Sequence, residues 1–108
     1  MALTREQILA RKVAGKTEIY PIDDGEVVIR GLTRNEALEV REAETLADKD
    51  NLLISLGLVE PTMSPEDVAA WAESDEAGVL AGLSERIGVL SGMSEGAGKS
   101  RVPRARRR

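Results

Sequence analysis

Aromatic side chains are almost absent from this chain, which has no Phe, one Trp and one Tyr among its 108 residues. Because aromatic residues normally supply much of the area that a core buries, this core must be built from Leu, Val, Ile and Ala. Leu, Ile and Val form about a quarter of the chain, which is more than a wholly disordered protein carries. The sequence therefore predicts one domain of helices packed through aliphatic stripes, not an aromatic-rich β-sandwich.

The chain also contains neither Cys nor His. This excludes disulfides, Cys/His zinc sites, Cys nucleophiles and Ser-His-Asp triads. We therefore expect no catalytic, cofactor-binding or metal-binding residues and a protein that is not an enzyme. No apolar run approaches the ~20 residues needed to span a membrane, and the first residues lack the pattern of a signal peptide. A cytoplasmic protein without a membrane partner is expected.

Charge divides the chain into two parts. Residues 1–98 hold nine basic and 19 acidic side chains, whereas residues 99–108 hold six basic and no acidic ones. From Met93 onward the composition has no hydrophobic period, which predicts disorder. We predict an N-terminal helical arm over 1–16, a hairpin plus helical core domain over 17–92, and a disordered Arg-rich tail over 93–108.

Two short elements are predicted in the N-terminal third. Thr4 and Gln7 have the spacing of a capping box, which predicts a helix over residues 5–14. Asp23-Asp24-Gly25 is a turn signal before a β-branched run, and it predicts a hairpin with strands over 17–22 and 26–31. Pro21 cannot donate to a ladder, so its strand should lie at a sheet edge.

Helix start signals recur in the middle of the chain. Thr33 and Glu36 form a second capping box, which opens a helix to about residue 47, with residues 48–51 either interrupting it or on its exposed face. Residues 52–59 are almost entirely apolar, which fits a buried strand or a buried helix. The excess of Leu favours a helix, and it should end before Pro61. Ser64-Pro65 begins the next helix.

The last helix is predicted to decide the fold. It opens at residues 74–76, ends at Gly92, and carries four large aliphatic residues at helical spacing. Burying all four stabilises the fold by about 6–12 kcal/mol. The first interpretation of these residues and of Trp71 is the chain's own core, and the second is a partner-binding or self-association surface. The candidates for that surface are Trp71, Leu80, Leu83, Ile87 and Leu90.

The predicted fold class is therefore mainly α with a small N-terminal β-hairpin (α+β), as a compact helical domain with a disordered basic C-terminal tail. Two motifs within it look like ligand sites but fail at required positions. Residues 96–100 end like a phosphate-binding loop, but Met93 stands where the pattern needs Gly. Residues 48–59 begin like a calcium loop, but Val59 stands where it needs Glu. No cofactor is expected.

The order of these signals resembles the tail assembly chaperones of long-tailed bacteriophages, over roughly residues 18–95. After the hairpin come the segments that carry the resemblance, VVIRGLTRNEALEVRE, LVEP, MSPEDVAAWAES and GVLAGLSERIGVLSGMSE. The resemblance implies a non-enzymatic protein of the host cytoplasm. It implies binding to the tape measure protein, which is kept soluble while tail tube protein subunits are recruited around it. It also implies absence from the finished virion.

The resemblance further implies a programmed frameshift that yields a longer form of the protein. The codons of Gly98 and Lys99 allow a slippery purine run, and the charge of the chain changes sign at this point. We expect residues 100–108 to be the short in-frame ending, with the longer form as a further partner. A gene without a slippery heptamer across the codons of Gly98 and Lys99, or without an overlapping downstream reading frame, would rule this out.

Two further expectations follow from charge and surface. The alternative function is a small nucleic-acid-associated regulatory protein that acts through its Arg-rich tail. Nucleic acid is not the expected partner, because no aromatics accompany the tail and the acidic body repels phosphates. An edge hairpin and a thin core also predict a homo-oligomer, such as a ring or spiral.

Overall fold

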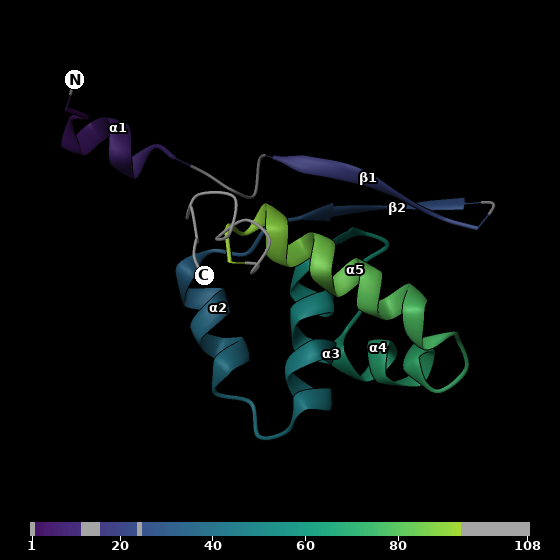
Figure 1. Cartoon of the computed structure of the whole chain (residues 1–108). Coiled ribbons are helices and arrows are strands. Elements are labelled where there is room, and N and C mark those ends of the chain that lie inside the picture. Colours follow the sequence, from purple (N-terminus) through teal and green to yellow (C-terminus); the bar gives the residue numbers. More distant parts are fainter. Residues whose placement is uncertain (1, 12–15, 24, 94–108) are drawn as a thin grey trace, which may run out of the picture.

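Helices dominate the chain, and a small antiparallel sheet lies along one side of them (Figure 1). This computed structural model describes residues 2–11, 16–23 and 25–93. It confirms the predicted fold class, mainly α with an N-terminal hairpin. The elements, in chain order, are α1 Arg5–Leu9, β1 Thr17–Ile22, β2 Gly25–Arg30, α2 Arg34–Arg41, α3 Leu46–Gly57, β3 Leu58–Glu60, α4 Pro65–Ala72 and α5 Ala77–Leu90.

The sheet contains the predicted hairpin and one strand that was not predicted. β1 and β2 pair antiparallel from Thr17 opposite Arg30 to Ile22 opposite Gly25, and Asp23 in the turn has a positive φ of 51°. The strand order β1-β2-β3 places Pro21 in an edge strand, which confirms that prediction. The prediction of one helix over residues 52–59 is wrong at its end. Leu58 leaves the helix and pairs with Ile29, so the chain gains a third strand.

Capping residues set where most helices begin. Thr4 with Gln7, Thr33 with Glu36, and Ser64 with Asp67 each form a capping box at the start of α1, α2 and α4. This confirms the predicted starts of these helices. The described part of α1 is shorter than predicted, because Ala10 caps it after five residues, and Gly15 lies outside the described residues.

The predicted long helix over residues 33–47 is two helices. Thr45 accepts a hydrogen bond from the backbone N–H of Asp48 and so caps a new helix, α3. The Lys49 ammonium donates to the carbonyl oxygens of Arg41 and Ala43, each at 2.7 Å, which satisfies one acceptor at the end of α2 and one just beyond it. The break therefore comes before residues 48–51, which lie within α3.

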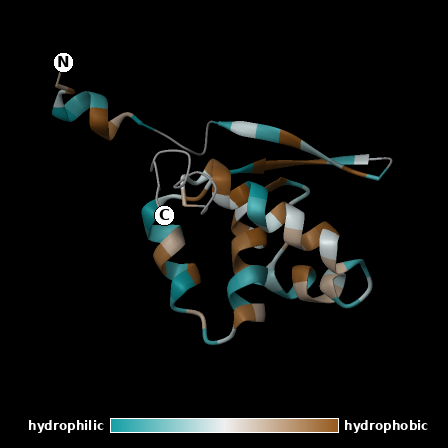
Figure 2. Ribbon diagram, viewed as in Figure 1, coloured by the Kyte–Doolittle hydropathy of each residue, from teal (hydrophilic) through white to brown (hydrophobic). Residues whose placement is uncertain are grey.

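The core lies among α2, α3, α4 and α5 and against the inner face of β2 and β3, and the apolar residues gather there (Figure 2). Its buried side chains are Ile29, Leu32, Val40, Ile54, Leu58, Val68, Leu83 and Ile87. Two glycines allow the close approaches that this packing needs. A Cβ on Gly57 would lie 2.6 Å from the Ile87 side chain, and one on Gly31 would lie 2.5 Å from the Leu90 carbonyl oxygen.

Two consecutive hydrogen bonds join the loop after β2 to the last turn of α5. The backbone N–H of Leu32 donates to the Ser91 hydroxyl at 2.7 Å, and that hydroxyl donates to the Ile87 carbonyl at 2.7 Å. Together with the contact at Gly31, this fixes the end of α5 against the loop between β2 and α2.

Candidate protein-binding surfaces

The carboxylate with the most strongly shifted pKa has a structural role. Glu36 accepts two hydrogen bonds from the Arg30 guanidinium, at 2.9 and 2.8 Å, and one from the backbone N–H of Thr33 at 2.9 Å. The Arg30 hydrogen bonds and, to a smaller extent, those from Thr33 lower the pKa of Glu36 to about 2. The pair ties the end of β2 to the first turn of α2, and a carboxylate so acidic is unsuited to proton transfer near neutral pH.

Two further carboxylates have lowered pKa values for similar reasons. Glu18 of β1 accepts bonds of 2.6 and 2.7 Å from the Arg86 guanidinium of α5, and these lower the pKa of Glu18. Asp75 accepts the indole N–H of Trp71 at 2.8 Å and the N–H of Glu76, which lowers the pKa of Asp75. The first contact holds the hairpin on α5, and the second shapes the turn before α5.

The five apolar residues named as a candidate surface separate into two groups. Leu83 and Ile87 are completely buried, so the core interpretation is confirmed for them and they form no surface of the folded chain. Leu80, Leu90 and Trp71 are half-buried and pack against the core cluster. α5 begins where the sequence predicts, with Glu76 at the N-cap position, although Glu76 makes no side-chain cap and Asp75 accepts the indole N–H of Trp71 instead.

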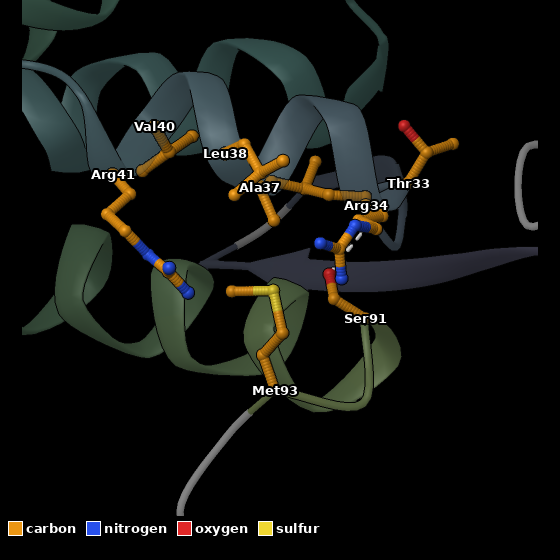
Figure 3. A pocket seen from close by; sticks show the side chains of 9 residues that line it. Thr33, Arg34, Ala37, Leu38, Val40, Arg41, Ser91 and Met93 are labelled. Atoms are coloured by element: carbon orange, nitrogen blue, oxygen red, sulfur yellow. Dashed lines mark hydrogen bonds between the residues drawn. The ribbon is translucent and has the colours of Figure 1, made fainter.

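A pocket lies between α2 and the end of α5, and we call it the α2–α5 pocket (Figure 3). It has a volume of about 620 Å³. Its floor is largely aliphatic, and Arg34 and Arg41 stand on either side of the Met93 thioether. The lining residues are Leu32, Thr33, Arg34, Ala37, Leu38, Val40, Arg41, Ser91 and Met93. An aliphatic floor between two cations suits a protein segment better than a small polar molecule.

The two arginines of this pocket were not singled out in the sequence. Neither guanidinium has an ion-pair or hydrogen-bond partner among the described residues, whereas Arg30 and Arg86 are both paired. The signal that could have found them is their spacing. Arg34, Leu38 and Arg41 stand at positions i, i+4 and i+7 of one helix and so share a face.

Large apolar side chains are exposed on α1 and on the outer side of the sheet. Within its described part, α1 has no buried residue. On β1, Ile19 is 60% exposed and pairs with Val28, on the side of the sheet opposite to the buried Ile29. Val59 of the neighbouring β3 is also exposed. The exposed large apolar residues of the described part are Leu3, Ile8, Leu9, Ile19, Leu46, Val59 and Met93.

Several sequence predictions fall on residues that the structure does not describe. The possible frameshift point, Gly98 and Lys99, lies outside the described residues, as does the Arg-rich tail from residue 94. Part of the arm over 1–16 lies outside them as well. These predictions stay predictions.

Within residues 2–11, 16–23 and 25–93, no group of three or more acidic side chains is placed to hold a metal ion, and no helix combines the length and apolarity of a membrane span. Comparison of the chain with models of known protein families, with curated proteins and with solved structures finds no match.

Proposed function

We propose that the protein is a tail assembly chaperone of a long-tailed bacteriophage, which acts by binding and not by catalysis. Its client is the tape measure protein, which it keeps soluble in the host cytoplasm while tail tube subunits are recruited, and it is left out of the mature virion. The observation that carries this proposal is the set of large apolar side chains exposed on α1 and on strands β1 and β3 of the sheet.

The outer face of the sheet is suited to covering one side of a client helix. Ile19 and Val28 lie opposite each other on adjacent strands, Glu60 of β3 pairs with Val28, and Val59 is exposed at the irregularity between β2 and β3. A soluble domain rarely leaves apolar side chains together without a partner. When a client helix with an aliphatic stripe binds to this face, the apolar side chains of both partners are buried.

The short helix α1 supplies a second apolar contact. Ile8 and Leu9 are each more than half exposed, and a helix of this length is marginal in water without something to pack against. A client that offers an apolar stripe stabilises α1 on binding. The arm then covers client surface that the sheet alone does not reach.

The charge of the body explains how such a complex stays in solution. Residues 1–98 carry ten more acidic than basic side chains. Net charge far from zero opposes association of one chaperone–client complex with another. Apolar contact surfaces on an acidic body therefore suit a protein that acts in stoichiometric amounts.

Co-expression with the tape measure protein of the same phage tests the proposal. We expect the wild-type chain to raise the soluble fraction of that client severalfold. A variant with Ile19→Asp and Leu9→Asp should lose most of this effect, because two charges then interrupt the apolar contacts. The measurement is the client's share in the supernatant after centrifugation.

A matched control uses Leu46→Asp, which places the same charge on another highly exposed Leu, at the first residue of α3. This variant should keep the client soluble. Deletion of residues 99–108 separates the two function classes, since the chaperone should retain its activity without the tail. Loss of all function on this deletion, or equal losses in the Ile19/Leu9 and Leu46 variants, would contradict the proposal.

A further inference from the structure

Two arginines of α2 lack the internal contacts that the other basic residues of the helical body have. Five basic residues lie in the described part of the chain from β1 to α5. Arg30 and Arg86 are held in ion pairs, and the Lys49 ammonium donates to two carbonyl oxygens. The other two, Arg34 and Arg41, have no hydrogen-bond or ion-pair partner among the described residues, and both line the α2–α5 pocket.

Helix spacing gives these two arginines no acidic partner on α2. A carboxylate pairs with a helical arginine from a position three or four residues away. Two positions of α2 stand at this spacing from both arginines, and they hold the apolar residues Ala37 and Leu38. Glu44, three residues after Arg41, lies beyond the end of α2 and forms no ion pair within the described residues. Carboxylates for Arg34 and Arg41 must therefore come from elsewhere.

The place of Arg34 in α2 also indicates a role other than helix stability. Arg34 is the first residue of α2, and Arg41 is the last. The helix dipole disfavours a cation in the first turn and favours one in the last turn. Arg34 therefore weakens α2 slightly, and an approaching carboxylate is attracted both by its guanidinium and by the N-terminus of the helix.

An apolar surface lies between the two charges. The arginines are separated by seven residues of helix, which span about 10.5 Å, and Leu38 lies between them on the same face. The Met93 thioether lies between the two guanidiniums (Figure 3), and an unbranched thioether adapts to the shape of what packs on it. A ligand that fits the whole site carries two negative charges about 10 Å apart with aliphatic groups between them.

We infer that the α2–α5 pocket binds an acidic amphipathic helix of a partner protein. Two carboxylates seven positions apart on that helix bind Arg34 and Arg41, and aliphatic side chains between them pack against Leu38 and Met93. The inference rests on this pocket and uses neither α1 nor the outer face of the sheet, so it does not depend on the proposed chaperone function.

Charge separates this partner from other occupants of the pocket. The chain's own end is a poor occupant, because residues 94–108 carry six basic side chains and one acidic side chain. Nucleic acid extends beyond the pocket onto a body whose residues 1–98 carry ten more acidic than basic side chains, and its phosphates make no use of the aliphatic floor. A short acidic helix places its charges only at the two arginines.

Fluorescence anisotropy of a labelled peptide tests the site in the full chain. The probe is an alanine-based helix with blocked ends, two glutamates seven positions apart, and leucines three and four positions after the first glutamate. The wild type should bind this probe, and replacement of both glutamates by glutamine should weaken binding about tenfold or more. Added salt should weaken binding of the glutamate probe far more than that of the glutamine probe.

Charge reversal in the chain should transfer its preference to the opposite probe. Arg34→Glu/Arg41→Glu should bind the glutamate probe about tenfold more weakly or worse and should gain binding of a probe with lysines in place of the glutamates. The matched control Arg5→Glu/Arg11→Glu makes the same change of net charge at two exposed arginines outside this pocket and should bind like the wild type. Arg34→Ala/Arg41→Ala gives the same comparison if circular dichroism shows that the reversal disturbs folding.

Methyl NMR of the methionines locates the bound probe. Met93 lines the pocket, whereas Met63 packs against the core cluster. Titration with the glutamate probe should therefore shift the methyl resonance of Met93 and leave that of Met63 in place. A shift at Met63 alone would place the probe elsewhere and overturn the inference.

Other results would also overturn it. They are a folded wild type that does not bind the glutamate probe, or a reversed variant that binds it as tightly as the wild type. Tighter binding of a single-stranded oligonucleotide would identify nucleic acid as the ligand. Weaker probe binding at higher chain concentration would assign the pocket to a second copy, and tighter binding after deletion of residues 94–108 would assign it to the chain's own end. Failure here with a positive co-expression result leaves the chaperone proposal standing, and the reverse pattern refutes that proposal alone.

Discussion

Replacement of Leu83 by Ala should lower the free energy of unfolding by about 2–5 kcal/mol. Leu83 is completely buried on α5 within the core cluster, and Ala leaves a cavity that aliphatic neighbours fill only in part. Because small domains are stable by only about 5–15 kcal/mol, this one change removes a large share of the total. Urea unfolding followed by circular dichroism measures the loss.

Leu46→Ala is the matched control for this prediction. It removes the same atoms from a Leu that is 82% exposed, and surface substitutions of this kind change stability by less than about 0.5 kcal/mol. Similar losses for the two variants would mean that α5 is not docked in the core as described.

The second large effect should come from Glu36→Gln. Gln retains the reach of a capping box to the Thr33 N–H, so the substitution isolates the charged pair with Arg30. The side chains of both partners are largely buried, at 18% and 22% exposure. Since the pKa of Glu36 falls from 4.5 to about 2 on folding, we expect a loss on the order of 2–3 kcal/mol at pH 7.

This loss should depend on pH in a definite direction. The pKa of Glu36 is lower in the folded than in the unfolded chain, so the unfolded chain binds the proton first as the pH falls. The stabilisation is complete above about pH 5 and disappears as the pH falls from 4.5 toward about 2. Thermal unfolding of wild type and Glu36→Gln should therefore converge over this range.

Glu39→Gln, at an exposed position of the same helix, should differ from wild type by less than about 0.5 kcal/mol throughout. Melting curves of Glu36→Gln that stay a constant distance below wild type from pH 6 to pH 2 would show that the charge on Glu36 is not what stabilises the fold.

Local chemistry made much of this fold predictable. Thr4, Thr33 and Ser64 mark helix starts because each cap depends only on residues three positions away. The hairpin was equally predictable from the sequence, since its turn and its β-branched run lie close together. The burial of Leu83 and Ile87 followed from their helical spacing.

The features that the sequence did not reveal depend on distant partners. Leu58 belongs to a strand only because β2 offers it an open edge, and nothing near Leu58 signals that edge. The break before α3 depends on the capping of a new helix by Thr45. The sequence alone fits this capping and a continuation of the helix that begins after Thr33 equally well. The α2–α5 pocket requires Met93 to reach α2, so neither segment alone predicts it.

The junction of Leu32 with Ser91 also constrains when the chain can fold during its synthesis. These residues are 59 positions apart, so β2 and α2 leave the ribosome long before the segment that completes their packing. Non-local closure of this kind slows folding, and the waiting segments expose apolar surface meanwhile. A nascent chain halted anywhere before residue 91 lacks this hydrogen bond, so the domain completes its packing only after residue 91 has left the ribosome.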